Sequence, residues 1–294
     1  QMNRLLQGDV GSGKTLVALM SMLLAVDNGF QACMMAPTEI LARQHYATFQ
    51  RMLEGMDVRV AILTGASKAR ERREALAGIA DGSIDLLIGT HALIEDRVQF
   101  SNLGFVVIDE QHRFGVEQRA RLWTKNEQPP HILAMTATPI PRTLNMALSG
   151  IRDMSTIEQP PQDRQPVQTY VLEHDWGILS EAIRRELDRG GQVYYLHNRV
   201  ESIDSTASRL RQLLGDGVVV ETAHGKMAEG ELSRVMGRMA QGDIQVLVCT
   251  TIIETGIDIP NVNTLIIEDA DRMGLSQLHQ IRGRIGRSNR RAYA

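Results

Sequence analysis

The 294 residues are 43% hydrophobic and 23% charged, the composition of a folded protein with room for two domains. This composition excludes a disordered, collagen-like or coiled-coil chain, and no run of about 18 apolar residues occurs that could span a membrane. A net charge of −3 gives no overall attraction to phosphate backbones, so contacts with nucleic acid would have to come from local groups. Cys33 and Cys249 lie far apart in apolar runs, which indicates buried thiols in a reducing compartment. We therefore expect a cytoplasmic protein with no membrane partner.

The first half of the chain alternates short apolar runs with amphipathic helical patterns. It opens in a strand that ends near Gln7, and we expect a complete protein to continue before this strand. Short strands that alternate with helices form βαβ units, whose parallel sheet is covered on both faces. The next predicted strands are Ala32–Ala36, Val58–Leu63, Ile84–Ile88, Phe105–Ile108 and Ile132–Met135, and the clearest helices are Thr15–Val26 and Thr38–Leu53.

The second half repeats this rhythm after a proline-rich segment. Residues 158–166 contain three prolines among polar side chains and cannot continue a helix or a central strand, so we expect a linker there. The sequence thus predicts two tandem α/β domains, residues 1–157 and 167–294, each a mostly parallel sheet flanked by helices and each truncated at its outer end. Within the second domain we expect strands at Thr169–Leu172, Val193–Leu196, Val218–Glu221, Val246–Cys249 and Leu265–Ile267, with helices at Ile178–Arg189, Ile203–Leu214 and Glu229–Gln241.

The segment Gly8–Thr15 fits the phosphate-binding pattern G-x-x-x-x-G-K-[ST] and lies between a predicted strand and a predicted helix. Its glycines let backbone N–H groups point at phosphate oxygens, and the helix adds the positive end of its dipole. We expect Lys14 to neutralise the terminal phosphates of ATP and Thr15 to bind Mg²⁺. The predicted nucleotide-binding residues of this loop are Gly8, Asp9, Val10, Gly11, Ser12, Gly13, Lys14 and Thr15.

An acidic pair, Asp109 and Glu110, follows the predicted strand Phe105–Ile108. Ligands of α/β sheets bind at the carboxyl ends of the strands, so the pair is predicted to meet the phosphate loop. We expect Asp109 to hold Mg²⁺ and Glu110 to polarise the water that attacks the γ-phosphate. A carboxylate beside the terminal phosphate favours hydrolysis over phosphoryl transfer.

Glycine and arginine alternate in the segment Gln280–Arg287. Such a segment can be a solvated basic turn, but in a chain with a phosphate loop it predicts an arginine finger that stabilises charge on the γ-phosphate. Arg284 and Arg287 are the candidates. The site would be complete only when the two domains close, and this closure would couple ATP hydrolysis to domain motion, as a motor requires.

Eight segments, taken in order, resemble the motif series of superfamily 2 helicases and translocases. The resemblance covers essentially the whole chain and implies two RecA-like domains that bind ATP between them. The segments are Gly8–Thr15, 36–38, 64–65, 89–91, 109–112, 136–138, 250–258 and Gln280–Arg287.

This resemblance also implies roles for individual residues. Loop hydroxyls and glycine N–H groups are neutral phosphate donors, which explains how an acidic chain could track a nucleic-acid backbone. Taken one at a time, each threonine could equally be a helix or strand cap. The implied nucleic-acid contacts are Pro37, Thr38, Thr64, Gly65, Thr90, His91, Thr250 and Thr251; the implied coupling residues are Gln111, His112, Thr136, Ala137, Thr138 and Gln280; further nucleotide contacts are Gly256 and Asp258.

Two families within the superfamily are similar to different parts of the chain. Leu5–Thr15, Ala36–His45 and 114–119 look like RecG, the bacterial fork-remodelling helicase, whereas 145–153 and 191–198 look like the bacterial transcription-repair coupling factor. The chain could be a mosaic joined near 136–143, or it could belong to a lineage between the two families.

Both families are double-stranded DNA translocases. The resemblance therefore implies an ATP-dependent DNA helicase or translocase motor that uses Mg²⁺, acts on double-stranded or branched DNA, and serves DNA repair and recombination. A coupling-factor motor, with RNA polymerase as a partner, is the first alternative. The second is a nucleotide-gated DNA-binding switch that grips DNA without net movement.

Overall fold

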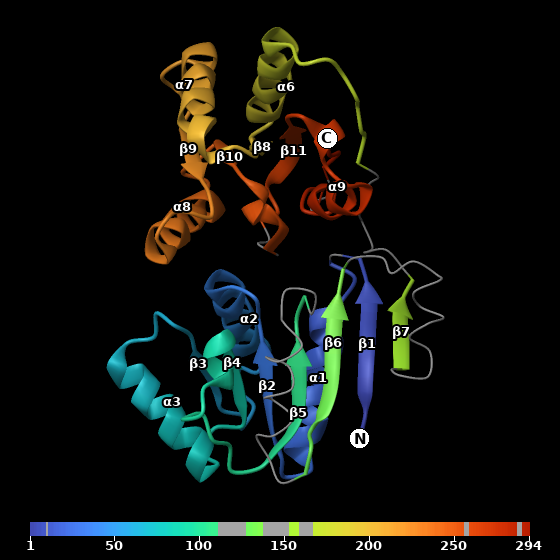
Figure 1. The fold of residues 1–294 in the computed structure, drawn as a ribbon, viewed down its shortest axis with the longest axis vertical. Coiled ribbons are helices and arrows are strands. Elements are labelled where there is room, and N and C mark those ends of the chain that lie inside the picture. Colours follow the sequence, from blue (N-terminus) through green and yellow to red (C-terminus); the bar gives the residue numbers. More distant parts are fainter. Residues whose placement is uncertain (10, 111–127, 138–152, 159–166, 256–258, 287–289) are drawn as a thin grey trace. The chain divides into compact units, whose positions relative to one another are not determined.

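The computed structural model describes residues 1–9, 11–110, 128–137, 153–158, 167–255, 259–286 and 290–294. The chain forms two compact units, Gln1–Pro160 and Pro161–Ala294. Each unit contains a parallel β-sheet with flanking helices, so the predicted class of two RecA-like α/β domains is confirmed (Figure 1). The predicted linker, 158–166, lies outside the described residues except for Glu158. No described helix is long and apolar enough to cross a membrane.

The first unit is built on a seven-stranded sheet in the order β3-β4-β2-β5-β6-β1-β7. Every pair of neighbouring strands in it is parallel. The five predicted strands after the first lie within two residues of the observed ones, whereas the edge strand β7 was not predicted. The elements are β1 (Asn3–Gly8), α1 (Lys14–Asp27), β2 (Gln31–Met35), α2 (Glu39–Met52), β3 (Val60–Leu63), α3 (Ala69–Asp81), β4 (Leu86–Gly89), the 3₁₀ turn η1 (His91–Ile94), β5 (Leu103–Ile108), β6 (His131–Thr136) and β7 (Asp153–Ile157).

Two hydrophobic clusters, one on each face, hold this sheet. Successive strand residues alternate between them: Met34 of β2 packs with the cluster that contains α1 and α2 residues, whereas Met35 packs with the cluster that contains α3 residues. Such two-sided burial explains why the strands read as continuous apolar runs and not as alternating ones. Because both faces of the sheet are covered, functional residues are expected at the ends of the strands.

The second unit is built on a four-stranded parallel sheet in the order β11-β8-β10-β9. The expected strand Thr169–Leu172 is wrong: only Gln168 forms a bridge there, with Tyr293, and Val171 is 93% exposed. The elements are α6 (Trp176–Asp188), β8 (Gln192–Leu196), η3 (Val200–Ser202), α7 (Ile203–Leu214), β9 (Val220–Ala223), α8 (Glu229–Gln241), β10 (Val246–Cys249), η4 (Thr251–Thr255), β11 (Val262–Ile267), η5 (Ala270–Arg272) and α9 (Leu275–Arg282).

Candidate nucleotide and nucleic-acid site

The phosphate loop connects the end of β1 to the start of α1, as the sequence pattern predicts. Gly11 and Gly13 adopt left-handed backbone conformations, with φ of 80° and 93°, which residues with a Cβ rarely adopt. Gly8 is restricted by space instead, because an added Cβ would lie 2.6 Å from the Ser12 hydroxyl oxygen. The Ser12 amide donates to the Asp9 carbonyl over 3.1 Å and closes a tight turn. Backbone conformation therefore favours glycine at Gly11 and Gly13, whereas at Gly8 the Ser12 hydroxyl would have to rotate to admit a Cβ.

The polar groups of this loop fit a nucleotide phosphate. The Lys14 ammonium lies over the loop, where it donates to the carbonyl oxygens of Gly8 and Asp9, each over 2.6 Å. Within the part of the chain that the structure describes, the buried Ser12 hydroxyl has no hydrogen-bond partner. Phosphate oxygens would satisfy this hydroxyl and could accept from the ammonium in charge-assisted hydrogen bonds. The role of Thr15, which is half-buried at the start of α1, stays a prediction.

Asp109 lies directly after β5 and is 7% exposed. Its amide donates to the Met35 carbonyl over 2.9 Å, which fixes it beside the end of β2. Burial raises the pKa of Asp109, but the hydrogen bond and charge of His45, together with the charge of Lys14, outweigh this and hold the pKa below its ordinary value. The influence of Lys14 brings the predicted metal-holding acid and the phosphate loop into one site.

His45 is a residue of this site that the motif analysis missed. It lies on α2, is 7% exposed, and its Nε2 is 2.8 Å from Oδ2 of Asp109. The only sequence signal was its place at the end of the RecG-like stretch Ala36–His45, because a single histidine on the apolar face of a helix matches no motif.

Glu110 is 6% exposed and has φ of 47°, so its backbone is left-handed although the residue is not glycine. A non-glycine residue held in this region costs about 1–3 kcal/mol, and such residues cluster at functional sites. This observed strain is consistent with the predicted role of Glu110 in polarising water, which stays a prediction.

Among the described residues, no group of three or more His, Cys, Asp and Glu side chains could hold a metal ion. A divalent cation at Asp109 would therefore depend on Thr15, phosphate oxygens and water for its other ligands. Mg²⁺ suits such a site because it keeps several waters and is usually bound by one or two carboxylates plus substrate phosphates.

The segment predicted to relay the nucleotide state begins at the end of β6. Thr136 pairs in parallel register with Gln7, the residue that precedes Gly8 of the phosphate loop. Thr136 and Ala137 are both buried. The role of Thr136 and Ala137 as a relay stays a prediction.

Three loops predicted to contact nucleic acid follow β2, β3 and β4, which are neighbours in the sheet. The three loops lie at one edge because the carboxyl ends of parallel strands meet there. The Thr38 hydroxyl caps α2 by accepting from the Leu41 amide over 3.3 Å. Thr64 and Thr90 are buried, whereas Gly65 and His91 are exposed. Backbone groups and the exposed residues, more than the threonine hydroxyls, are thus presented at this edge.

The predicted residues of the second unit are largely buried. Thr250 follows β10, Gln280 lies on α9, and Arg284 lies just after it; they are 7%, 8% and 3% exposed. A freely projecting arginine finger would be exposed, so presentation of Arg284 to a phosphate stays a prediction. The remaining predicted residues that lie outside the described ones are Val10, Gln111, His112, Thr138, Gly256, Asp258 and Arg287.

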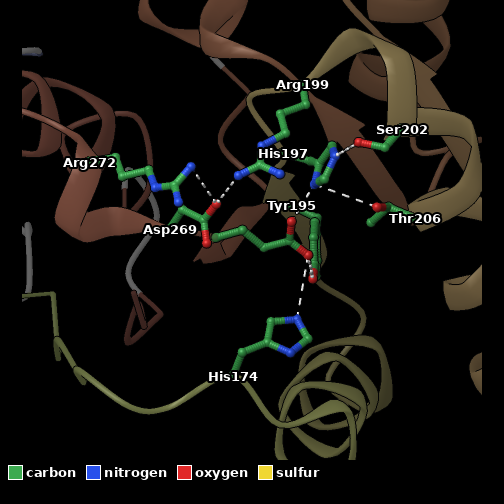
Figure 2. Close-up of polar contacts among 9 residues, drawn as sticks. His174, Tyr195, His197, Arg199, Ser202, Thr206, Asp269 and Arg272 are labelled. Carbon is green, nitrogen blue, oxygen red and sulfur yellow. Dashed lines mark hydrogen bonds and ion pairs between the residues drawn. The ribbon is translucent and has the colours of Figure 1, made fainter.

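A polar network that the motif analysis also missed lies at the carboxyl ends of β8 and β11 (Figure 2). The ring of His197 points toward Ser202, whose hydroxyl oxygen is 2.7 Å from Nε2, while Nδ1 contacts Glu268. Glu268 also accepts from the Tyr195 hydroxyl over 2.5 Å. These contacts tie two strand ends to the start of α7, and a small cavity opens beside them.

Comparisons with known proteins agree with this architecture. The profile of the DEAD/DEAH box helicase family matches residues 1–147, and that of the helicase conserved C-terminal domain matches residues 177–289. Transcription-repair-coupling factors are similar over the whole chain, at 50% identity for Bacillus subtilis and 51% for Escherichia coli, and the chain spans about a quarter of their length. Both halves of the chain are therefore matched within one family.

Solved structures are similar as well. RecG bound to a three-way DNA junction is 41% identical, with a TM-score of 0.84 over 99% of this chain and 39% of RecG. Dbp5 of S. cerevisiae, bound to RNA and ADP BeF3, has a TM-score of 0.77 over 99% of this chain and 78% of Dbp5, at 18% identity. The second likeness shows the shared fold alone.

Proposed function

Because the chain belongs to the DEAD/DEAH box helicase family and forms a superfamily 2 helicase core, we propose that it is the motor of an ATP-dependent DNA translocase or helicase. The observation that carries the proposal is that the phosphate loop after β1 and the buried Asp109 after β5 lie at the same edge of the sheet, on either side of β6. This arrangement joins a phosphate cradle to a metal-holding acid, which are the two parts that nucleotide hydrolysis needs.

We propose that residues of the first unit bind and orient ATP. The loop amides and Lys14 bind the phosphates, and Thr15 and Asp109 hold Mg²⁺, whose charge offsets that of the phosphates when it is bound. Glu110 polarises the attacking water from its position next to Asp109. We propose further that Arg284 and Arg287 stabilise the charge that develops on the γ-phosphate.

Double-stranded or branched DNA is the proposed substrate, in DNA repair and recombination. The DNA junction in the RecG structure supports this choice, as do the loops at the edge formed by β2, β3 and β4. Since the similar coupling factors are bacterial, we place this activity in the bacterial cytoplasm.

The first alternative is the motor of a transcription-repair-coupling factor, which the identity of 50% over the whole chain favours. RNA polymerase would then be a partner. The second alternative is a switch whose DNA grip changes with nucleotide but which does not move along DNA.

ATP turnover of the full-length protein, measured with and without duplex DNA, tests the motor. We expect strong stimulation by DNA, which Lys14→Ala and Arg287→Ala abolish. ATP-gated DNA binding without stimulated turnover would favour the switch. Displacement of a DNA triplex strand then measures movement, and parallel tests on a model fork and on a stalled RNA polymerase separate the RecG-like pathway from the coupling-factor pathway.

A further inference from the structure

The contact between His45 and Asp109 joins two parts of the first unit to which the proposed function gives separate tasks. Asp109 holds the metal in that proposal, and α2, which carries His45, begins at the segment Pro37–Thr38 that is predicted to contact DNA. Nε2 of His45 and Oδ2 of Asp109 are 2.8 Å apart, and both side chains are at most 10% exposed. Such a buried contact has a fixed geometry, because water cannot replace either partner.

The position of the His45 ring is itself determined by packing. The ring lies against Phe49, one helical turn later, with centroids 6.3 Å apart and planes tilted by 52°. Phe49 is fully buried in the cluster beneath α1 and α2. The ring therefore moves with α2 as a unit.

The start of α2 is held in place by a helix cap and by a hydrogen bond to the end of β4. The Thr38 hydroxyl caps the helix, and the amide of Ala36, two residues before Thr38, donates to the Gly89 carbonyl over 2.8 Å. His45 lies seven positions after Thr38, about 10 Å along the helix axis. A displacement of Pro37–Thr38 on DNA would consequently change the contact between His45 and Asp109.

We infer that His45 is a positioning residue, which orients the Asp109 carboxylate for Mg²⁺ and transmits to it the state of the DNA-facing Pro37–Thr38 segment. His45 holds Oδ2 of Asp109, so the orientation of the carboxylate is fixed. The other oxygen would then be available to Mg²⁺ or to one of its waters. The inference rests on the proposed function for the roles of Mg²⁺ and DNA. It goes beyond that function by proposing that the DNA-facing segment and the Mg²⁺-holding carboxylate are coupled through residues of the first unit alone.

The test compares His45→Gln with His45→Asn in the full-length protein. The Gln amide reaches about as far as Nε2 of histidine and keeps a donor near Asp109, whereas the Asn amide is one methylene shorter. The first readout is the affinity of a fluorescent ADP analogue with and without Mg²⁺. The second is the ratio of ATP turnover with duplex DNA to turnover without it. His131→Gln is the control, because His131 is exposed at the opposite end of β6 from Thr136.

We expect His45→Asn to reduce the Mg²⁺-dependent gain in ADP affinity by roughly 10-fold or more, in the range found when partners of metal ligands are removed. ADP affinity without Mg²⁺ should stay unchanged, and the ratio of turnover with DNA to turnover without DNA should fall severalfold. His45→Gln should keep most of the Mg²⁺-dependent gain in affinity and most of the DNA stimulation. Equal loss of ADP affinity with and without Mg²⁺ would mean a purely structural role and overturn the inference. The inference would also be overturned if His45→Asn kept the wild-type gain in ADP affinity with Mg²⁺ and the wild-type ratio of turnover with and without DNA.

The failure of the proposed function gives a different result. If the wild-type protein shows no DNA-stimulated turnover, the motor proposal fails, and the coupling role of His45 fails with it. The Mg²⁺-dependent ADP affinity still decides whether His45 orients Asp109, because that measurement needs neither DNA nor turnover.

Discussion

The ammonium of Lys14, at the start of α1, acts electrostatically on the carboxylate of Asp109, at the end of β5. The two residues reach one site because β1 and β5 are both hydrogen-bonded to β6 in a parallel sheet. Their carboxyl ends therefore face the same edge. An ammonium and a buried carboxylate at one edge supply the charges that the proposed binding of a metal-bound polyphosphate would need.

Removal of the Lys14 charge should abolish turnover without unfolding the protein. We expect Lys14→Ala to lower the rate of basal ATP hydrolysis by about 10²-fold or more, since a charge at the γ-phosphate stabilises the transition state. Steady-state ATPase assays measure this effect. Arg51→Ala, a charge removal at an exposed position at the end of α2, should leave the rate unchanged. Equal losses in the two variants would contradict a specific role for Lys14.

The left-handed conformation of Gly13 should make it irreplaceable for nucleotide binding. Gly13→Ala forces a Cβ onto a backbone with φ of 93°, at an expected cost of about 1–2 kcal/mol in unfolding free energy. Gly29→Ala is the matched control, because Gly29 has φ of 82° and neither added Cβ would meet an atom within 4 Å. Both variants should lose similar stability in denaturant titrations, but only Gly13→Ala should lose affinity for ADP.

Glu268 should be essential for the network at the carboxyl ends of β8 and β11. Glu268→Ala leaves the partly buried donors of Tyr195 and His197 without their acceptor, and we expect a loss of about 3 kcal/mol in unfolding free energy. Tyr195→Phe removes a donor and leaves Glu268 with His197, so its loss should be nearer 1 kcal/mol. Amide hydrogen exchange in β8 reports both changes. Equal protection in the two variants would show that the carboxylate contributes little.

Glu95 should make the stability of the first unit depend on acid pH. Partial burial raises the pKa of Glu95, but contacts with Arg97 and Arg72, 2.5 Å and 3.1 Å away, lower it below its ordinary value of 4.5. A lowered pKa in the folded state means that the stabilisation is complete above pH 4.5 and is lost as the pH falls through the lower folded value.

Glu95→Gln tests this dependence by the unfolding free energy as a function of pH. At pH 7 the variant should be less stable by up to about 1 kcal/mol, since the pair is partly exposed. The difference should vanish in acid. Asp96→Asn, at the exposed neighbouring position, serves as the control. A difference that stays constant with pH would mean that the charge of Glu95 is not the cause.

The fold class, the phosphate loop and the acidic pair could all be predicted from the amino-acid sequence. Each of these is a local pattern: buried parallel strands read as apolar runs, and the turn into α1 requires glycine at Gly11 and Gly13 because of their positive φ. The strand Thr169–Leu172 was predicted wrongly, because an apolar composition does not by itself supply a neighbouring strand with which to pair.

The side chains that surround Asp109 and Glu268 could be identified from the folded structure but not from the sequence. His45 lies far from Asp109 in the chain, and His197 far from Glu268, and no local spacing brings either pair together. Parallel strand order and helix packing do so, by placing α2 over β3 and β4 with His45 at the end of β5, and β8 beside β11. The folded structure likewise buried Thr64 and Thr90, which directly follow the neighbouring strands β3 and β4.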